Sequence, residues 1–204
     1  MSVQQISEPF ITEAEYIRRE RDAEVKSEYF QGRIYAMSGA TPAHNVLCAH
    51  TIAELIIRLR GKPCNVYTSD QRIRVEATGL NTYPDISVVC GESQFAAMDS
   101  NAILNPSLIV EALSPSTSNY HRTTKFDHYK TIPTFADYLL LHTDRVRVEH
   151  FSRNEQNIWT HTVATVRETE IPIVNLSITL SVAELYRNLD LPTFSLLHAT
   201  SDVL

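Results

Sequence analysis

Glycine, cysteine and long apolar runs are all scarce in this chain of 204 residues. Only 5 glycines stand beside 9 prolines, and 43% hydrophobic with 21% charged residues excludes a fibrous or disordered chain. No apolar run approaches the roughly 18 residues of a membrane span, and the N-terminus lacks a signal-peptide pattern. We expect a cytoplasmic protein without a membrane partner, built as one domain over residues 1–204 with its core at about 12–190.

Cysteine is rare, and its spacing does not suit a disulfide framework or a common metal site. Cys48, Cys64 and Cys90 are odd in number, widely spaced and never in a CxxC pair. This pattern argues against a disulfide framework and against a cysteine-based zinc site. We interpret all three as buried thiols.

Several catalytic signatures are also absent. Without a GxSxG elbow, a P-loop or a dinucleotide fingerprint, neither a serine hydrolase nor the use of ATP or NAD is indicated, and the SPSTS run at 114–118 predicts a turn. The chain has 8 histidines but no HExxH. The pairs His44/His50 and His121/His128 do not have the i, i+4 spacing of a helical zinc pair, so neutral, hydrogen-bonded histidines are the simpler interpretation.

Positive charge is in the minority, with 18 Lys and Arg against 24 Asp and Glu and a formal net charge of -6. Affinity for nucleic acid comes largely from Lys and Arg that neutralise phosphates, so any DNA site must be a local patch. Most basic residues are expected to be ordinary solvated charges. The candidate patches are Arg58, Arg60 and Lys62 near one helix end, Arg72 and Arg74 on a strand, and the group of Arg122, Lys125 and Lys130.

The apolar patterns predict an α/β (α+β) fold. Thr12 followed by EAEYIRRERD predicts a short capped helix, and SEYFQGRIYAMS predicts a hairpin that turns at Gln31-Gly32. The clearest helix begins at Thr41-Pro42 and ends at Gly61. Three strand-like runs follow, and we expect them in the middle of the sheet. They are NVYTSDQRIRVE, TYPDISVVC and SLIVEALS.

The C-terminal half continues this alternation. Residues 121–132 have helical spacing up to Pro133, and the strand DYLLLH then suggests a right-handed crossover. VRVEHF, IWTHTVAT and IPIVNLSITL predict antiparallel strands. The run from Ser181 to Glu184 fits a capping box that opens a final helix, and a tail or docking segment follows from about Leu191.

Two carboxylates lie where burial would be costly. Glu111 lies within the apolar run SLIVEALS, and Asp85 directly precedes ISVVC. A buried carboxylate must be paired or bound to a cation, and neighbouring strands could bring both groups to one hard cation such as Mg²⁺. The alternatives are a strand-entry residue for Asp85 and, for Glu111, a buried partner of Arg72 or Arg74.

The order Pro84-Asp85, Glu111 and then a lysine resembles the PD-(D/E)xK nuclease superfamily. The longer blocks TYPDISVVCG, LNPSLIVEALSPST, KFDHYKTIP and DYLLL resemble the Uma2 family of bacterial restriction endonucleases, over nearly the whole chain. The resemblance implies a restriction-endonuclease-like mixed β-sheet flanked by helices, with additional antiparallel C-terminal strands. It also implies a metal-dependent endonuclease that hydrolyses phosphodiester bonds in DNA.

The resemblance implies a metal centre as well. Asp85 and Glu111 would bind Mg²⁺, or Mn²⁺ in its place, with the backbone carbonyl of Ala112 as a third ligand. Leu113 stands where the ExK signature has its lysine, and Lys125 on the following helix would replace it. That lysine would orient or polarise the attacking water and offset the developing negative charge.

Three further residues match positions of the family, and a fourth, His121, departs from its pattern. Glu28 would assist as another catalytic carboxylate, and Asp70 either joins the site or pairs with Arg72. His44 either contacts phosphate or caps its helix. His121 stands where relatives usually carry aspartate: if that aspartate orients the lysine, activity is weakened or retuned, and if it only caps the helix, nothing follows.

Two classes of function therefore remain. The first is a Mg²⁺-dependent DNA endonuclease, expected as a homodimer because two active sites match a two-stranded substrate. The second is a catalytically silent nuclease-fold module that binds or assists, acting with a mobile element or defence system. The acidic net charge and His121 favour the second, whereas the retention of Asp85, Glu111 and Lys125 together favours the first.

Overall fold

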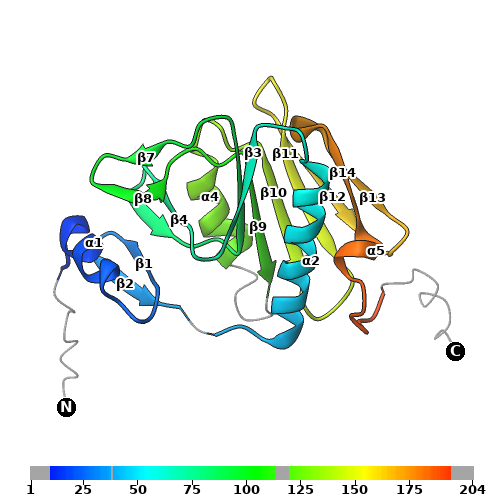
Figure 1. Ribbon diagram of the computed structural model, residues 1–204, viewed down its shortest axis with the longest axis horizontal. Helices are drawn as coiled ribbons and strands as arrows, with labels where there is room; N and C mark the ends of the chain where they lie inside the picture. The colour runs from blue at the N-terminus through cyan, green and yellow to red at the C-terminus, as the bar shows by residue number, and fades with distance from the viewer. Residues whose placement is uncertain (1–9, 38, 114–119, 194–204) are drawn as a thin grey trace, which may run out of the picture.

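The computed structural model describes residues 10–37, 39–113 and 120–193, and Figure 1 labels its elements. The helical elements are α1 (Glu13–Arg21), α2 (Pro42–Arg58), the π-helical turn η1 (His121–Lys125), α4 (Phe126–Tyr129), the 3-10 turn η2 (Val174–Leu176) and α5 (Val182–Leu185). The strands are β1 (Ser27–Phe30), β2 (Arg33–Ala36), β3 (Cys64–Thr68), β4 (Arg72–Val75), β5 (Leu80–Thr82), β6 (Ile86–Cys90), β7 (Phe95–Ala96), β8 (Asp99–Ile103), β9 (Leu108–Leu113), β10 (Asp137–His142), β11 (Val148–Arg153), β12 (Trp159–Ala164), β13 (Glu170–Ile173) and β14 (Ile178–Ser181).

These strands form two six-stranded sheets and one two-stranded sheet. The first, called the site sheet below, has the order β12-β11-β10-β9-β6-β3, and the second, the N-terminal sheet, has the order β2-β1-β5-β4-β8-β7. β9 pairs in parallel with β10, whereas β10, β11 and β12 are antiparallel, as are β13 and β14. The predicted α+β class, the mixed sheet and the antiparallel C-terminal strands are confirmed.

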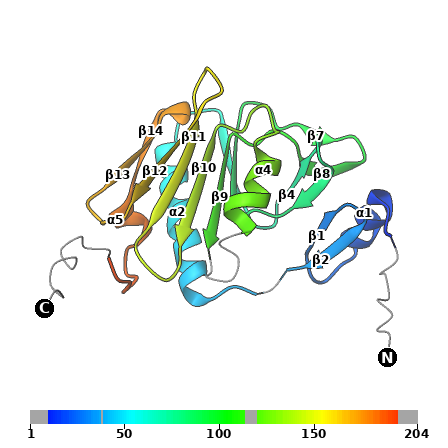
Figure 2. The same ribbon diagram turned by 180° about the vertical axis from the view of Figure 1, so that it is seen from behind.

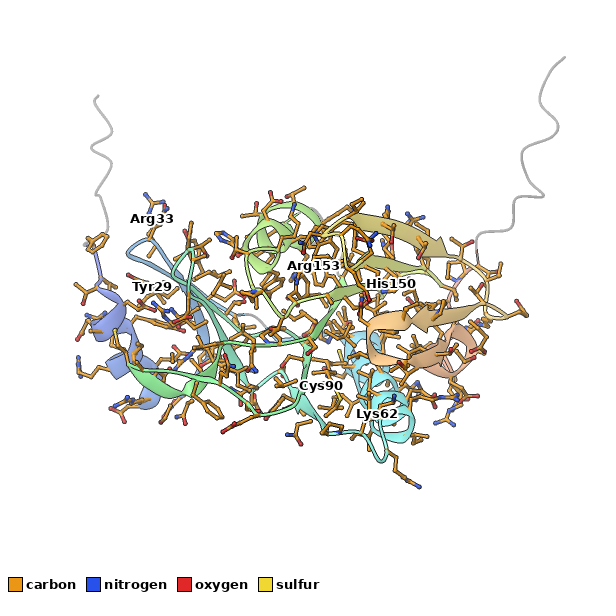
Figure 3. All side chains as sticks on the ribbon, turned by 90° about the horizontal axis from the view of Figure 1, so that it is seen from above. Tyr29, Arg33, Lys62, Cys90, His150 and Arg153 are labelled. Carbon is orange, nitrogen blue, oxygen red and sulfur yellow. A yellow bond between two sulfur atoms is a disulfide. The ribbon has the colours of Figure 1, made fainter. Side chains whose placement is uncertain are left out.

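The predicted N-terminal elements are also present. Thr12 caps α1 by accepting a hydrogen bond from the backbone N–H of Glu15, and Thr41 caps α2 in the same way. The hairpin of β1 and β2 turns at Gln31 and Gly32, which have positive φ angles of 47° and 83°. The hairpin lies at the opposite end of the molecule from β13 and β14, as Figure 3 shows by its labelled Tyr29 and Arg33.

α2 covers one face of the site sheet and α4 lies on the other (Figures 1 and 2), with an apolar cluster on each side. Side chains of β9 alternate between its faces: Leu108 and Val110 pack in the cluster that contains α2, whereas Ile109 and Leu113 pack in the cluster that contains α4 and the N-terminal sheet. By the same alternation, Glu111 faces α4 and the N-terminal sheet. The strand pattern therefore directs this carboxylate into the space between two layers.

The prediction for the run NVYTSDQRIRVE is corrected. A turn at Ser69 and Asp70 divides it into two strands, because these residues hydrogen-bond readily to nearby backbone and favour turns. β3 becomes an edge strand of the site sheet, and β4 joins the N-terminal sheet. Of the three runs expected in the middle of one sheet, only those forming β6 and β9 lie there.

Two helix predictions are also corrected. The segment predicted as one helix over 121–132 is a π-helical turn followed by the short α4, which ends at Tyr129. Ser181 does stand at the N-cap of α5, but its side chain makes no capping hydrogen bond, and α5 has only 4 residues. The predicted turn at 114–118 and most of the predicted C-terminal tail lie outside the described residues.

The interpretation of three buried thiols is wrong. Cys64 and Cys90 stand opposite each other on β3 and β6 and form a disulfide, with Cα atoms 4.0 Å apart. A separation of 26 residues gives no sign of this pairing, which comes from the strand register. Cys48 remains the free cysteine and is half-buried. Across the described ranges, no helix is long and apolar enough to cross a membrane.

Candidate metal centre and active site

Two adjacent strands place Asp85 and Glu111 on the same side of the site sheet. β6 and β9 are antiparallel with Ile86 opposite Val110, and this register brings Asp85, the residue before β6, opposite Glu111. Opposite residues of an antiparallel pair share a face. One oxygen of Asp85 accepts a hydrogen bond of 2.8 Å from the backbone N–H of Ala112, which fixes the carboxylate beside β9.

Glu111 is a buried carboxylate with three polar neighbours. Only 2% of its side chain is exposed. Its Oε1 lies 2.9 Å from the Lys125 ammonium and accepts a hydrogen bond of 3.1 Å from the Tyr129 hydroxyl, while Oε2 lies 3.5 Å from Nδ1 of His121. Burial alone raises the pKa of Glu111, but Lys125 and His121 outweigh it and hold the pKa at about 2. The carboxylate is therefore ionised at neutral pH.

Lys125 lies between two carboxylates. Its Nζ is 2.9 Å from Glu111 and 2.9 Å from Glu28, and 2% of its side chain is exposed. Burial alone lowers the pKa of the ammonium, yet the two carboxylates raise it above its ordinary value. The lysine is thus a permanently charged group at the base of the site.

Glu28 enters from the other sheet. It lies on β1 and is 8% exposed, and it accepts hydrogen bonds from the hydroxyls of Thr82 and Tyr120, the latter at 3.3 Å. The prediction that Glu28 assists at the site rests on family resemblance alone, and in the structure its carboxylate lies 2.9 Å from the Lys125 ammonium. The cluster therefore joins the two sheets.

Two histidines flank the carboxylates. Nε2 of His44, in the first turn of α2, lies 3.2 Å from Asp85, and this hydrogen bond raises the pKa of the imidazole. The side chain of Thr41, and not that of His44, caps this helix. His121 faces Glu111, and its buried Nδ1 has no hydrogen-bond partner in the described part of the chain. His121 therefore contacts the carboxylate itself.

Asp70 is not brought into this cluster of buried groups. Its side chain is 84% exposed and pairs with Lys26 at 2.8 Å. The suggested pair with Arg72 does not form either, because Arg72 is buried and pairs with Asp99. Arg74 pairs with Glu13 at 2.6 Å. The alternative in which Glu111 neutralises one of these arginines is therefore wrong.

The clustered residues line one cavity of about 720 Å³. Residues of β1, α2, β9 and η1 line it, and so does the turn at Ser69 and Asp70. Metal-ligating, basic and hydroxyl groups thus share a space large enough for a phosphate and several waters. The site residues that line it are Glu28, His44, Asp70, Asp85, Glu111, Ala112, Tyr120, His121 and Lys125.

Sequence reasoning missed four groups that contact this cluster. Tyr129 shows the spacing of a core residue, and only the fold reveals that its hydroxyl reaches Glu111. Thr82 and Tyr120 hold Glu28, although neither lies in a motif. Cys48 lies one helical turn after His44, and its Sγ is 3.7 Å from Nδ1 of that imidazole. Among these four groups, only the i, i+4 spacing of His44 and Cys48 could have been recognised in the sequence.

The fold and the site define a class of protein: a mixed sheet between helical and sheet layers, with two carboxylates and a lysine at one cavity, is a nuclease-type fold. The chain belongs to the Uma2 family, whose description is "Putative restriction endonuclease", and residues 13–183 match it. The predicted family is thereby confirmed.

Individual relatives agree with this assignment. The chain is 35% identical over 149 residues to "Uncharacterized protein sll1609" of Synechocystis sp., covering 73% of this chain and 84% of that protein. It is 34% identical over 151 residues to "Uncharacterized protein slr1290" of the same organism, covering 74% of this chain and 78% of that protein. A crystal structure of a putative nuclease belonging to DUF820 from Anabaena variabilis is similar to this one, with a TM-score of 0.70 and 18% sequence identity. The similarity covers 86% of this chain and 97% of that chain, and it supports the fold.

Proposed function

We propose that this protein is a metal-dependent endonuclease that hydrolyses phosphodiester bonds in DNA. The observation that carries the proposal is the placement of Asp85 opposite Glu111, with the charged Lys125 buried against the latter, at one cavity. A fold gains little stability from burying two carboxylates and an ammonium together, because desolvation offsets most of their attraction. A catalytic site, in contrast, needs such groups preorganised.

The donor set fits Mg²⁺ or Mn²⁺. Asp85 and Glu111 offer carboxylate oxygens, each with two lone pairs and thus with capacity beyond the present hydrogen bonds. The backbone carbonyl of Ala112 is the proposed third ligand. When bound, such a cation supplies Lewis-acid stabilisation of phosphate charge and a more acidic water.

The protein's own groups would complete the chemistry. The Lys125 ammonium would orient the attacking water and offset the negative charge that develops on the phosphate. Glu28 and Glu111 hold this ammonium from two sides, and Tyr120 and Thr82 hold Glu28 in turn. His44 would orient Asp85 through their 3.2 Å contact.

The second candidate is a nuclease-fold module that does not cut, and it is favoured by the net charge of -6 and by His121. The imidazole of His121 lies 3.5 Å from Glu111, so a second basic group faces a proposed metal ligand. A positive imidazolium there would compete with the metal for Glu111. Metal binding separates the two candidates.

The decisive experiment is calorimetric titration of Mg²⁺ or Mn²⁺ into the wild type and Asp85→Ala, followed by plasmid nicking at low salt. We expect metal binding and nicking in the wild type and the loss of both in the variant. Asp85→Asn is the matched control, because its amide oxygen still accepts the Ala112 N–H while the charge is lost. No metal binding by the wild type at millimolar concentration, with DNA present, would establish the silent module instead.

The assembly and location stay as predicted from the sequence. A homodimer would present two sites to the two strands of a duplex, and a monomer in light scattering would contradict it. The cytoplasmic location is likewise a prediction, which fractionation of cells can test.

A further inference from the structure

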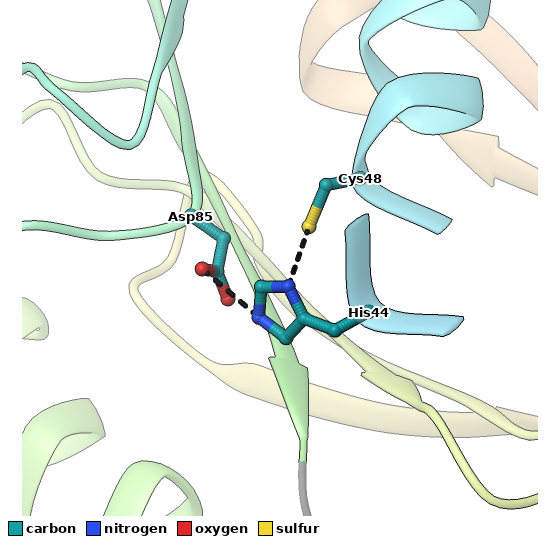
Figure 4. Close-up of side chains that lie close together, drawn as sticks. All are labelled: His44, Cys48 and Asp85. Carbon is teal, nitrogen blue, oxygen red and sulfur yellow. Dashed lines mark hydrogen bonds and ion pairs between the residues drawn. The ribbon is translucent and has the colours of Figure 1, made fainter. Parts of the chain in front are cut away.

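Three possible ligands of a second kind meet at the start of α2 (Figure 4). Nδ1 of His44 lies 3.7 Å from Sγ of Cys48, and Nε2 lies 3.2 Å from Oδ1 of Asp85. One ligand atom from each residue falls within 4.8 Å of the others, and all three residues are partly buried. Nitrogen, sulfur and oxygen donors therefore converge beside the proposed Mg²⁺ centre.

We propose that His44, Cys48 and Asp85 form a second cation site, for a borderline transition metal such as Zn²⁺ or Co²⁺. The site shares Asp85 with the proposed Mg²⁺ centre, so the two ions compete for one carboxylate. A thiolate and an imidazole favour Zn²⁺ and Co²⁺ over Mg²⁺, which prefers oxygen ligands. Three protein ligands leave a fourth position open to water.

The spacing of the donors suits tetrahedral coordination. With bonds of about 2.0 Å to nitrogen and 2.3 Å to sulfur, two ligands of a tetrahedral ion lie roughly 3.5 Å apart, close to the 3.7 Å between the imidazole and the thiol. The imidazole of His44 now lies between the thiol of Cys48 and the carboxylate of Asp85. To bind one ion through a single ring nitrogen, these side chains must move by distances on the order of 1 Å.

The local fold already holds these groups in place. His44 and Cys48 stand at i and i+4 on α2, and therefore on one face of the helix. The Thr41 cap fixes the turn that carries His44. Asp85 is held from the other side by the Ala112 N–H. The same face of α2 thus presents both the imidazole and the thiol to a carboxylate anchored on the sheet.

Cys48 makes the site easy to observe. The other two cysteines of the chain are joined to each other, so Cys48 is its only free thiol. Any thiolate bound to a metal in the oxidised protein must therefore belong to Cys48. Binding Co²⁺ would give a thiolate-to-metal charge-transfer absorption band in the near ultraviolet.

The test is a Co²⁺ titration of the full chain, followed by absorption spectroscopy. We expect the charge-transfer band in the wild type, its loss in Cys48→Ser and in His44→Gln, and its retention in Glu111→Gln, which lacks a ligand of the Mg²⁺ centre only. Circular dichroism checks that each variant is folded, and Cys64→Ser with Cys90→Ser is the control that keeps Cys48 as the only thiol. No band in the wild type at millimolar Co²⁺, or a band that survives Cys48→Ser, overturns the proposal.

The consequence for activity rests on the proposed nuclease function. Zn²⁺ should inhibit Mg²⁺-dependent nicking by the wild type, and Cys48→Ser should nick normally but require more Zn²⁺ for half inhibition. Equal inhibition of both proteins would overturn the competition. If neither protein nicks DNA while the Co²⁺ band is present and depends on Cys48, the nuclease proposal fails and the metal site stands.

Discussion

Lys125 carries a full charge at a position where only 2% of its side chain is exposed. Both of its partners, Glu28 and Glu111, are themselves buried. Removing one member of such a cluster leaves the others without compensation in a medium that solvates charge poorly. The structural role of this lysine and its proposed catalytic role can therefore be measured separately.

The substitution Lys125→Met keeps most of the side-chain length and removes the charge. We expect a destabilisation of about 3–5 kcal/mol, as is typical when one partner of a buried ion pair is lost, measured by urea denaturation. Nicking should disappear, whereas Mg²⁺ binding should persist or strengthen because Glu111 has lost a competing cation. Lys125→Met with Glu28→Gln is the matched control and should recover part of the stability without recovering nicking. A folded Lys125→Met protein that still nicks DNA would rule out the catalytic role.

At the scale of elements, Glu149 on β11 connects four segments. Its carboxylate lies 2.9 Å from His142 at the end of β10, 3.1 Å from Arg147 before β11, 3.2 Å from His161 on β12, and in contact with Arg122 on η1. Only 2% of its side chain is exposed. This carboxylate therefore holds η1, the segment that carries His121 and Lys125, against the site sheet.

This arrangement predicts a specific dependence of stability on pH. Burial alone raises the pKa of Glu149, but hydrogen bonds from His142, Arg122 and Arg147 outweigh it and leave the pKa far below the ordinary value of 4.5. A depressed pKa in the folded state contributes stability that is present above the unfolded pKa and is lost as the pH falls below it. Acidification below about pH 4.5 should therefore reduce this contribution progressively, until the pH falls through the folded pKa.

The variant Glu149→Gln isolates that contribution. We expect it to be less stable than the wild type at pH 7, by about 1–3 kcal/mol for lost charged hydrogen bonds, with a difference that shrinks as the pH falls toward 3. Urea midpoints at several pH values measure the difference, and Glu170→Gln, an exposed position on β13, is the control. A difference that stays constant down to pH 3 would mean that Glu149 keeps no depressed pKa.

At the scale of the whole molecule, the net charge of -6 opposes binding to DNA, so the location of the basic residues matters. Two of the candidate patches are weakened by the structure: Lys125 and Arg72 are buried, and Arg74 is paired with Glu13. The group around Glu149 is different: three partly exposed arginines, Arg122, Arg145 and Arg147, outnumber the two carboxylates that they pair with, Glu149 and Asp144. Arg145 and Arg147 are 48% and 34% exposed, two and four residues after Thr143, which lines the site cavity.

We therefore expect Arg145 and Arg147 to contact the phosphate backbone of bound DNA. Each phosphate contact contributes about 0.9 to the slope of log affinity against log salt, so Arg145→Ala with Arg147→Ala should lower the slope by roughly 2. Fluorescence anisotropy in Ca²⁺, over a series of salt concentrations, measures this. Arg58→Ala with Arg60→Ala is the matched control at the far end of α2, roughly 20 Å from His44 along the helix. Equal slopes in the two double variants would contradict the assignment.

The sequence by itself determined most of the local elements and the candidate residues of the main site. The Thr12 and Thr41 caps, the Gln31-Gly32 turn and the apolar runs of β6, β9 and β10 depend on neighbouring residues, and short-range patterns show them. Two carboxylates in apolar surroundings and the order of the family's blocks were enough to select Asp85, Glu111 and Lys125. These residues needed no knowledge of how the strands pair.

Only the tertiary structure decided what depends on strand register and on packing between layers. The disulfide of Cys64 with Cys90 and the hydrogen bond of Tyr129 to Glu111 join residues that are distant in the chain. The run around Asp70 is divided between two sheets by the pairing of its two strands with different partners. The meeting of His44 and Cys48 with Asp85 is of the same kind. Such contacts follow from which faces of a helix and a sheet are buried together, and no local pattern of residues encodes that choice.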